Sequence, residues 1–80
     1  MEFNERLRLI RKTEGYTQKE FAKLLNSSEI GIRLYETNKR TPNGWFFMVL
    51  GKKFPEYSLW LNTGKTGILQ TSPKIVEKRT

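Results

Sequence analysis

Helix-ending residues recur along residues 1–64 and limit any helix there to a few turns. Gly15, Asn26, Asn38, Pro42 and Pro55 stand where a pattern of apolar residues stops. Between them, apolar residues recur at intervals of three or four, which is the spacing of one face of an α-helix. This alternation of helical segments and helix-ending residues predicts an all-α chain of short helices.

The predicted helices begin at recognisable capping residues. Thr17 is followed three positions later by Glu20, a capping box in which each side chain accepts a hydrogen bond from the other residue's backbone amide. Ser28 and Asn43 are further capping residues. We expect helices over residues 4–14, 18–25 and 29–37, another around 45–50, and a last one over 56–62. Their expected core residues are Leu7, Ile10, Phe21, Ala22, Leu24, Leu25, Ile32, Tyr35, Tyr57, Trp60 and Leu61.

The composition excludes several kinds of chemistry. The chain has 80 residues, which suffice for one small module, and it contains no Cys and no His. Disulfides, thiolate or imidazole metal sites, and Ser/His or Cys/His catalysis are therefore excluded. Glu20, Glu36 and Glu77 fall on separate predicted elements, and no phosphate-binding glycine loop is present. We expect no enzyme activity, no metal and no cofactor.

The charge of the chain is strongly positive. Lys and Arg outnumber Asp and Glu by 15 to 8, which gives a net charge of +7. This balance favours a polyanionic partner, and a merely solvated surface is the other interpretation. Since the sequence has neither an apolar run of membrane-spanning length nor the start of a signal peptide, we expect a cytoplasmic protein without membrane contact.

Residues 65–80 differ in character from the rest of the chain. Two short β-prone segments, 67–70 and 74–77, are separated by Thr71-Ser72-Pro73. They form either a hairpin, which would pair with its copy in a second subunit, or a flexible basic tail. The expected organisation is therefore a helical domain over residues 1–64 followed by a tail over 65–80.

Residues 17–37 meet the demands of a unit that places one helix in the DNA major groove. Such a unit needs two short helices joined by a tight turn, the second with an exposed polar face. Here Thr17 caps the first helix, Ala22 is small enough for the helices to cross closely, and Ile32 anchors the second helix to the core. These features predict binding to double-stranded DNA.

The motif Gly-Tyr-Thr-Gln-Lys-Glu-Phe-Ala-Lys-Leu-Leu over residues 15–25 carries a family resemblance, together with Tyr35-Glu36, Lys39-Arg40-Thr41-Pro42 and Trp60-Leu61. Over residues 5–64 the chain resembles phage-repressor-type (Cro/C1, XRE-like) helix-turn-helix domains. With residues 57–60 and its short tail it is also similar to the small immunity repressors of peduovirus-type temperate phages. The resemblance implies a compact five-helix bundle, a reading helix over 29–37, and a partly buried ion pair between Arg11 and Glu36.

The resemblance also assigns residues to contacts with DNA. The positions that face bases hold chemistry suited to them, since Arg can donate to guanine, Glu can accept from cytosine and Ile can contact a thymine methyl. Phosphate contacts are implied at the start of residues 18–25 and in the loop after residue 37. The base-reading set is Glu29, Ile30, Arg33 and Leu34, and the phosphate-binding set is Thr17, Gln18, Ser28, Asn38, Lys39, Arg40, Thr41 and Asn43.

Three features depart from the family pattern. Asn38 replaces the usual glycine, and Gly31 lies inside the reading helix, either for close approach to DNA or for packing. Apolar residues also stand where the family has polar ones, which predicts a homodimer contact continued by the tail. Alternatives are a larger monomer core around Trp45 or stacking on single-stranded bases. The predicted dimer residues are Trp45, Val49, Leu59, Ile68, Leu69, Ile75 and Val76.

The resemblance, taken with these features, implies a transcriptional repressor of a temperate phage that binds an operator with repeated half-sites as a homodimer and maintains lysogeny in a bacterial host. An activator or Cro-type regulator would share the same reading unit. A protein of another class, an antitoxin that clasps a toxin through the apolar residues and the tail, is the alternative. Because the chain has no room for an effector domain, an antirepressor protein is a candidate partner for relief of repression.

Overall fold

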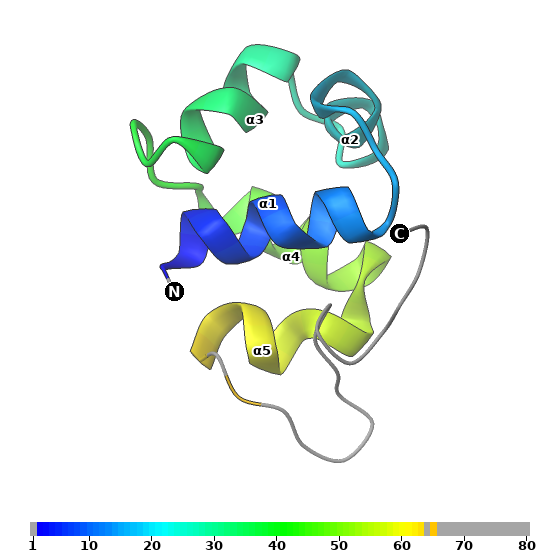
Figure 1. The fold of residues 1–80 in the computed structure, drawn as a ribbon, viewed down its shortest axis with the longest axis vertical. Coiled ribbons are helices and arrows are strands. Elements are labelled where there is room, and N and C mark those ends of the chain that lie inside the picture. The colour runs from blue at the N-terminus through cyan, green and yellow to red at the C-terminus, as the bar shows by residue number, and fades with distance from the viewer. Residues whose placement is uncertain (1, 64, 66–80) are drawn as a thin grey trace.

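The computed structural model describes residues 2–63 and 65, and every regular element in this part of the chain is helical. Figure 1 shows the elements in order: α1 (Phe3–Thr13), α2 (Gln18–Leu24), α3 (Glu29–Glu36), α4 (Gly44–Lys53), the 3-10 helix η1 (Pro55–Tyr57) and α5 (Ser58–Thr63). The predicted all-α bundle is confirmed. No helix among these residues is long and apolar enough to cross a bilayer.

Side-chain caps fix where three of the helices begin. Thr17 Oγ1 accepts from the Glu20 amide at 3.1 Å and the Thr17 amide donates to Glu20 Oε1 at 2.9 Å, so the predicted capping box is confirmed. Ser28 Oγ accepts from the Gly31 amide, and Asn43 Oδ1 accepts from the Phe46 amide, each at 2.9 Å. Local sequence therefore determines the entry into α2, α3 and α4.

Left-handed backbone closes the turns between α1, α2, α3 and α4. The φ angles are 83° at Gly15, 57° at Asn26 and 60° at Asn38. Glycine adopts this region without steric cost, and asparagine does so more readily than most other residues. At position 38, asparagine therefore adopts a backbone conformation that glycine also favours.

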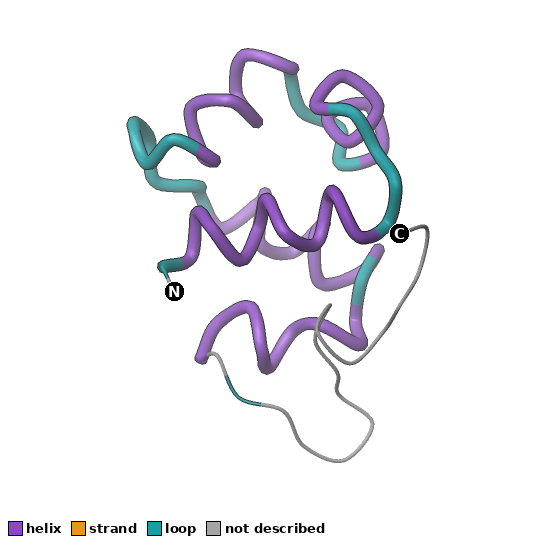
Figure 2. Tube along the Cα trace, in the orientation of Figure 1, coloured by secondary structure: helices purple, strands orange, loops and turns teal. Residues whose placement is uncertain are grey.

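The bundle has α1 at its centre. In Figures 1 and 2, α2 and α3 lie on one side of α1 and α5 lies on the other, with α4 behind it. Aromatic contacts join the layers, with ring centroids 4.6 Å apart for Tyr35 and Phe46 and 5.9 Å apart for Phe21 and Phe54. The predicted core residues are buried except Leu24, which is only partly buried, and the core also includes Phe46, Leu50 and Phe54.

Two sequence-based expectations need correction or lie beyond the described residues. The single helix expected over 56–62 begins instead as a 3-10 turn at Pro55–Tyr57, in which the Tyr57 amide donates to the Phe54 carbonyl three residues earlier at 3.1 Å, and continues as α5. The expected hairpin or tail, with Ile68, Leu69, Ile75 and Val76, lies outside the part of the chain that the structure describes.

Tyr57 links the second half of the chain to α1 through a buried hydrogen bond. Its hydroxyl donates to Glu14 Oε2 at 2.8 Å, and the ring is fully buried. Burial raises the pKa of Tyr57 above its ordinary value, and the nearby Glu14 carboxylate raises it further.

We expect Tyr57→Phe to lower the free energy of unfolding by about 1.5–3 kcal/mol, because it removes a buried hydrogen bond to a charged group. Because the pKa of Tyr57 is higher in the folded than in the unfolded chain, protonation of its hydroxyl also stabilises the fold. This contribution is fully present below pH 10 and is lost as the pH rises toward the folded-state pKa. Urea unfolding at several pH values from 7 to 11.5 measures both effects. The difference in the free energy of unfolding between wild type and Tyr57→Phe must shrink above pH 10. A constant difference contradicts the buried hydrogen bond assigned to Tyr57.

Candidate nucleic-acid interface

The exposed face of α3 carries the predicted base-reading residues. Glu29, Ile30 and Arg33 are exposed, and Ile30, at 65% of its full exposure, is the most exposed large apolar residue among those described. Leu34 is half-buried and lies at the margin of this face. On the opposite face, Ile32 and Tyr35 are buried in the core, so α3 cannot rotate without exposing them.

Arg33 and Glu29 form an ion pair on the exposed face. Arg33 Nη2 lies 3.6 Å from Glu29 Oε2, and both side chains remain about half exposed. Exposed pairs of this kind contribute little to stability. Little free energy is therefore lost when the Arg33 guanidinium leaves Glu29.

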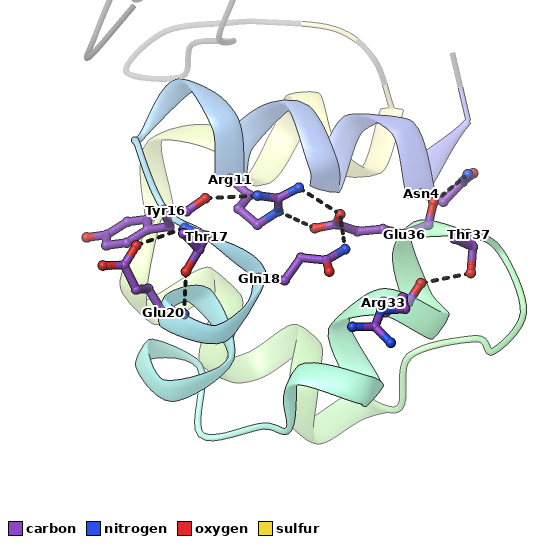
Figure 3. A network of polar contacts seen from close by, with 9 residues as sticks. All are labelled: Asn4, Arg11, Tyr16, Thr17, Gln18, Glu20, Arg33, Glu36 and Thr37. Atoms are coloured by element: carbon purple, nitrogen blue, oxygen red, sulfur yellow. Dashed lines mark hydrogen bonds and ion pairs between the residues drawn. The ribbon is translucent and has the colours of Figure 1, made fainter.

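A buried polar network lies where α1, α2 and α3 meet. Arg11 Nε donates to Glu36 Oε2 at 2.7 Å and Arg11 Nη2 donates to Glu36 Oε1 at 3.1 Å, so the expected ion pair is confirmed. Arg11 Nη1 also donates to the Tyr16 carbonyl at 2.9 Å. Gln18 Nε2 donates to Glu36 Oε1 at 3.2 Å, a contact that the sequence analysis missed. Figure 3 shows these side chains converging between the three helices.

The loop from residue 38 to residue 43 presents polar groups beyond the end of α3. The Lys39 and Arg40 amides donate to the Leu34 carbonyl at 2.8 and 3.2 Å, which folds the loop back over the end of the helix. All the phosphate-binding candidates of this loop are exposed: Asn38, Lys39, Arg40, Thr41 and Asn43. Thr17 and Ser28 are also exposed, and each hydroxyl oxygen accepts from the amide of the helix it caps.

Gly31 packs against the cap of its own helix. A Cβ at this position would lie 3.0 Å from Ser28 Oγ and 3.3 Å from Ser27 Oγ. Ser28 Oγ is the acceptor for the Gly31 amide, so a larger residue would press on the cap. The two interpretations of Gly31 were close approach to DNA and packing. The contacts with Ser27 and Ser28 give a structural reason for packing.

Large apolar side chains of α4 and α5 are also exposed, and we call them the exposed apolar group. Trp45 is 58% exposed, Met48 46% and Leu59 37%. Val49 is half-buried and packs against the core, so it contributes only an edge. Met48 was missed, although it stands one helical turn after Trp45. Because Trp45 lies outside the core, the alternative of a larger monomer core around it is wrong.

Comparison with known proteins agrees with this geometry. A family model described as helix-turn-helix matches residues 7–44. These residues form a helix-turn-helix unit. The matched segment contains most of α1, all of α2 and α3, and the basic loop. Neither the search of curated proteins nor that of solved structures finds a match. The helix-turn-helix match supports a DNA-binding regulator as the class of protein.

In this helix-turn-helix, Arg33 and Arg40 have different predicted roles that substitution can separate. We expect Arg40→Ala to weaken binding to all duplexes alike and to lower the salt slope by about one, because a phosphate contact carries no sequence information. We expect Arg33→Ala to relax the preference at one base pair, with a loss of about 1–3 kcal/mol in binding free energy for the preferred pair. Anisotropy titrations at several salt concentrations, against a selected duplex and its single-pair variants, measure both. Uniform weakening by both variants would show that α3 does not read bases through Arg33.

Proposed function

We propose that the chain is a sequence-specific transcriptional repressor that occupies an operator in double-stranded DNA and excludes RNA polymerase. The observation that carries this proposal is the exposed face of α3, with Glu29, Ile30 and Arg33, next to an exposed basic loop. The family resemblance further supports a role as the immunity repressor of a temperate phage, acting in the cytoplasm of its bacterial host.

The proposed complex divides the contacts between two sets of residues. Arg33 donates to a guanine edge, Ile30 meets a thymine methyl, Glu29 accepts from a cytosine amino group and Leu34 adds an apolar edge. Phosphates near the starts of α2 and α3 are held by Thr17, Gln18 and Ser28. The loop from Asn38 to Asn43 lies along the sugar-phosphate backbone of the DNA. Lys39 and Arg40 supply the cationic part of this grip.

We further propose a homodimer that buries the exposed apolar group of α4 and α5. Trp45, Met48 and Leu59 would form its centre, with Val49 at the edge. The tail residues Ile68, Leu69, Ile75 and Val76 remain proposed members on sequence grounds. A two-fold dimer would present two α3 helices to half-sites about 34 Å apart, or a multiple of that distance. We also propose an antirepressor protein as the partner that relieves repression, with a fall in concentration as the alternative.

Sedimentation with a random duplex library tests the function. The purified protein is sedimented alone and with the library, and the duplexes that co-migrate are sequenced. A dimer that enriches a repeated sequence with half-sites about one helical turn apart supports the repressor. A chain that enriches no sequence contradicts the proposal and favours the antitoxin alternative, in which the same apolar residues bind another protein.

Two exposed apolar residues make a matched pair for the dimer prediction. We expect Trp45→Ser to shift the sedimentation equilibrium toward monomer by about tenfold or more in Kd, since interface aromatics carry much of the binding energy. Ile30→Ser removes a side chain of similar exposure from the reading face and should leave the dimer intact while weakening operator binding. Equal sedimentation of wild type and Trp45→Ser refutes the proposed interface.

A further inference from the structure

Glu36 is a buried anion whose hydrogen bonds come from two other helices. Its side chain is only 2% exposed, and it accepts from Arg11 Nε, Arg11 Nη2 and Gln18 Nε2. Its backbone carbonyl also accepts from Asn4 Nδ2 at 3.2 Å, which attaches the end of α3 to the start of α1. Figure 3 shows Arg11, Glu36 and Gln18 meeting between the helices, with Asn4 next to the backbone of Glu36.

This environment determines the orientation of the Gln18 carboxamide. An ionised carboxylate only accepts hydrogen bonds, so Gln18 must turn its amino group, and not its oxygen, toward Glu36. One N–H of Nε2 is then directed at Glu36 Oε1, 3.2 Å away. The second N–H of the same nitrogen is left for another acceptor, in a direction fixed by the first.

Arg11 makes this arrangement compatible with a nearby phosphate. A buried carboxylate without a partner would repel an anion, but the two hydrogen bonds from Arg11 neutralise Glu36. Arg11 Nη1 also holds the Tyr16 carbonyl, directly before the Thr17 cap, so the start of α2 is attached to the same network. The position of Gln18 relative to α3 is therefore set by contacts already present in the free protein.

We propose that Glu36 is a positioning residue that presets Gln18 to donate its second amide N–H to a DNA phosphate. This inference rests on the proposed function. Since Glu36 is the last residue of α3 and Gln18 is the first of α2, their hydrogen bond couples the phosphate contact to the placement of the reading helix. Ordering a glutamine side chain costs conformational entropy. Because the hydrogen bond to Glu36 already orders Gln18 in the free protein, this cost does not weaken DNA binding.

Binding measurements on substituted full-length chains test the coupling, with the selected duplex as probe. We expect Gln18→Ala to weaken binding about three- to tenfold with no change in salt slope, because the lost group is neutral. Gln18→Asn keeps a carboxamide but is one methylene too short to contact both Glu36 and a phosphate, so it should weaken binding as much as Gln18→Ala. Wild-type affinity in the Gln18→Asn variant overturns the proposal.

Glu36→Gln provides the second test. Arg11 donates to both oxygens of Glu36, whereas the new carboxamide has a single acceptor oxygen. Arg11 Nε, Arg11 Nη2 and Gln18 Nε2 then compete for that oxygen, and the new amino group faces at least one of these donors, so the bond to Gln18 is weakened. We expect Glu36→Gln to weaken binding, to leave the base preference unchanged, and to reduce the loss caused by Gln18→Ala when the two are combined. Additive losses, or an altered base preference, would mean that Glu36 acts only by holding α3 in place.

A readout without DNA covers the case in which Glu36→Gln does not fold. In the nitrogen-15 spectrum of the free wild type, one Nε2 proton of Gln18 should exchange more slowly with water than the other. Equal, rapid exchange of the two protons overturns the proposal. If the wild type selects no duplex, the proposed function fails and this inference with it; if it binds but Gln18 behaves independently of Glu36, only the inference fails.

Discussion

The ion pair between Arg11 and Glu36 joins α1 to the last residue of α3, and the placement of α3 depends on it. A buried pair is not in itself a large source of stability, because desolvation of both charges opposes their attraction. Its effect is on orientation: the guanidinium donates to both carboxylate oxygens, at 2.7 and 3.1 Å, and this bidentate geometry permits little rotation of α3 against α1. Loss of one partner would leave a buried charge unpaired.

Local signals in the sequence predict much of this fold. The caps at Thr17, Ser28 and Asn43 are satisfied within three residues of each side chain, so they are visible from residue order alone. The same is true of the left-handed turn at Asn38, where a helical pattern ends at a residue that tolerates positive φ. Contacts of this range require no knowledge of the tertiary structure.

Contacts between distant residues were much less predictable. The Arg11–Glu36 pair was expected only from family resemblance, and the bond from Gln18 to Glu36 was missed, because no spacing rule relates residues on different helices. The sequence also did not predict which side of α4 is buried, since residues 45–50 are apolar all round. Its buried side is decided by partners elsewhere: Phe46 packs on Tyr35 and Phe47 on Phe3, which leaves Trp45 and Met48 exposed.

The exposed face of α3 and the exposed apolar group are connected through the loop from residue 38 to residue 43. At one end, the Lys39 and Arg40 amides bind the Leu34 carbonyl and attach the loop to α3. At the other end, Asn43 caps α4, and Trp45 stands in the first turn of that helix. Because the loop is held at both ends, a partner that covered Trp45 would fix the start of α4 and restrain the loop with it. In the proposed dimer, the spacing of the two reading helices therefore depends on α4 and its cap as much as on α3.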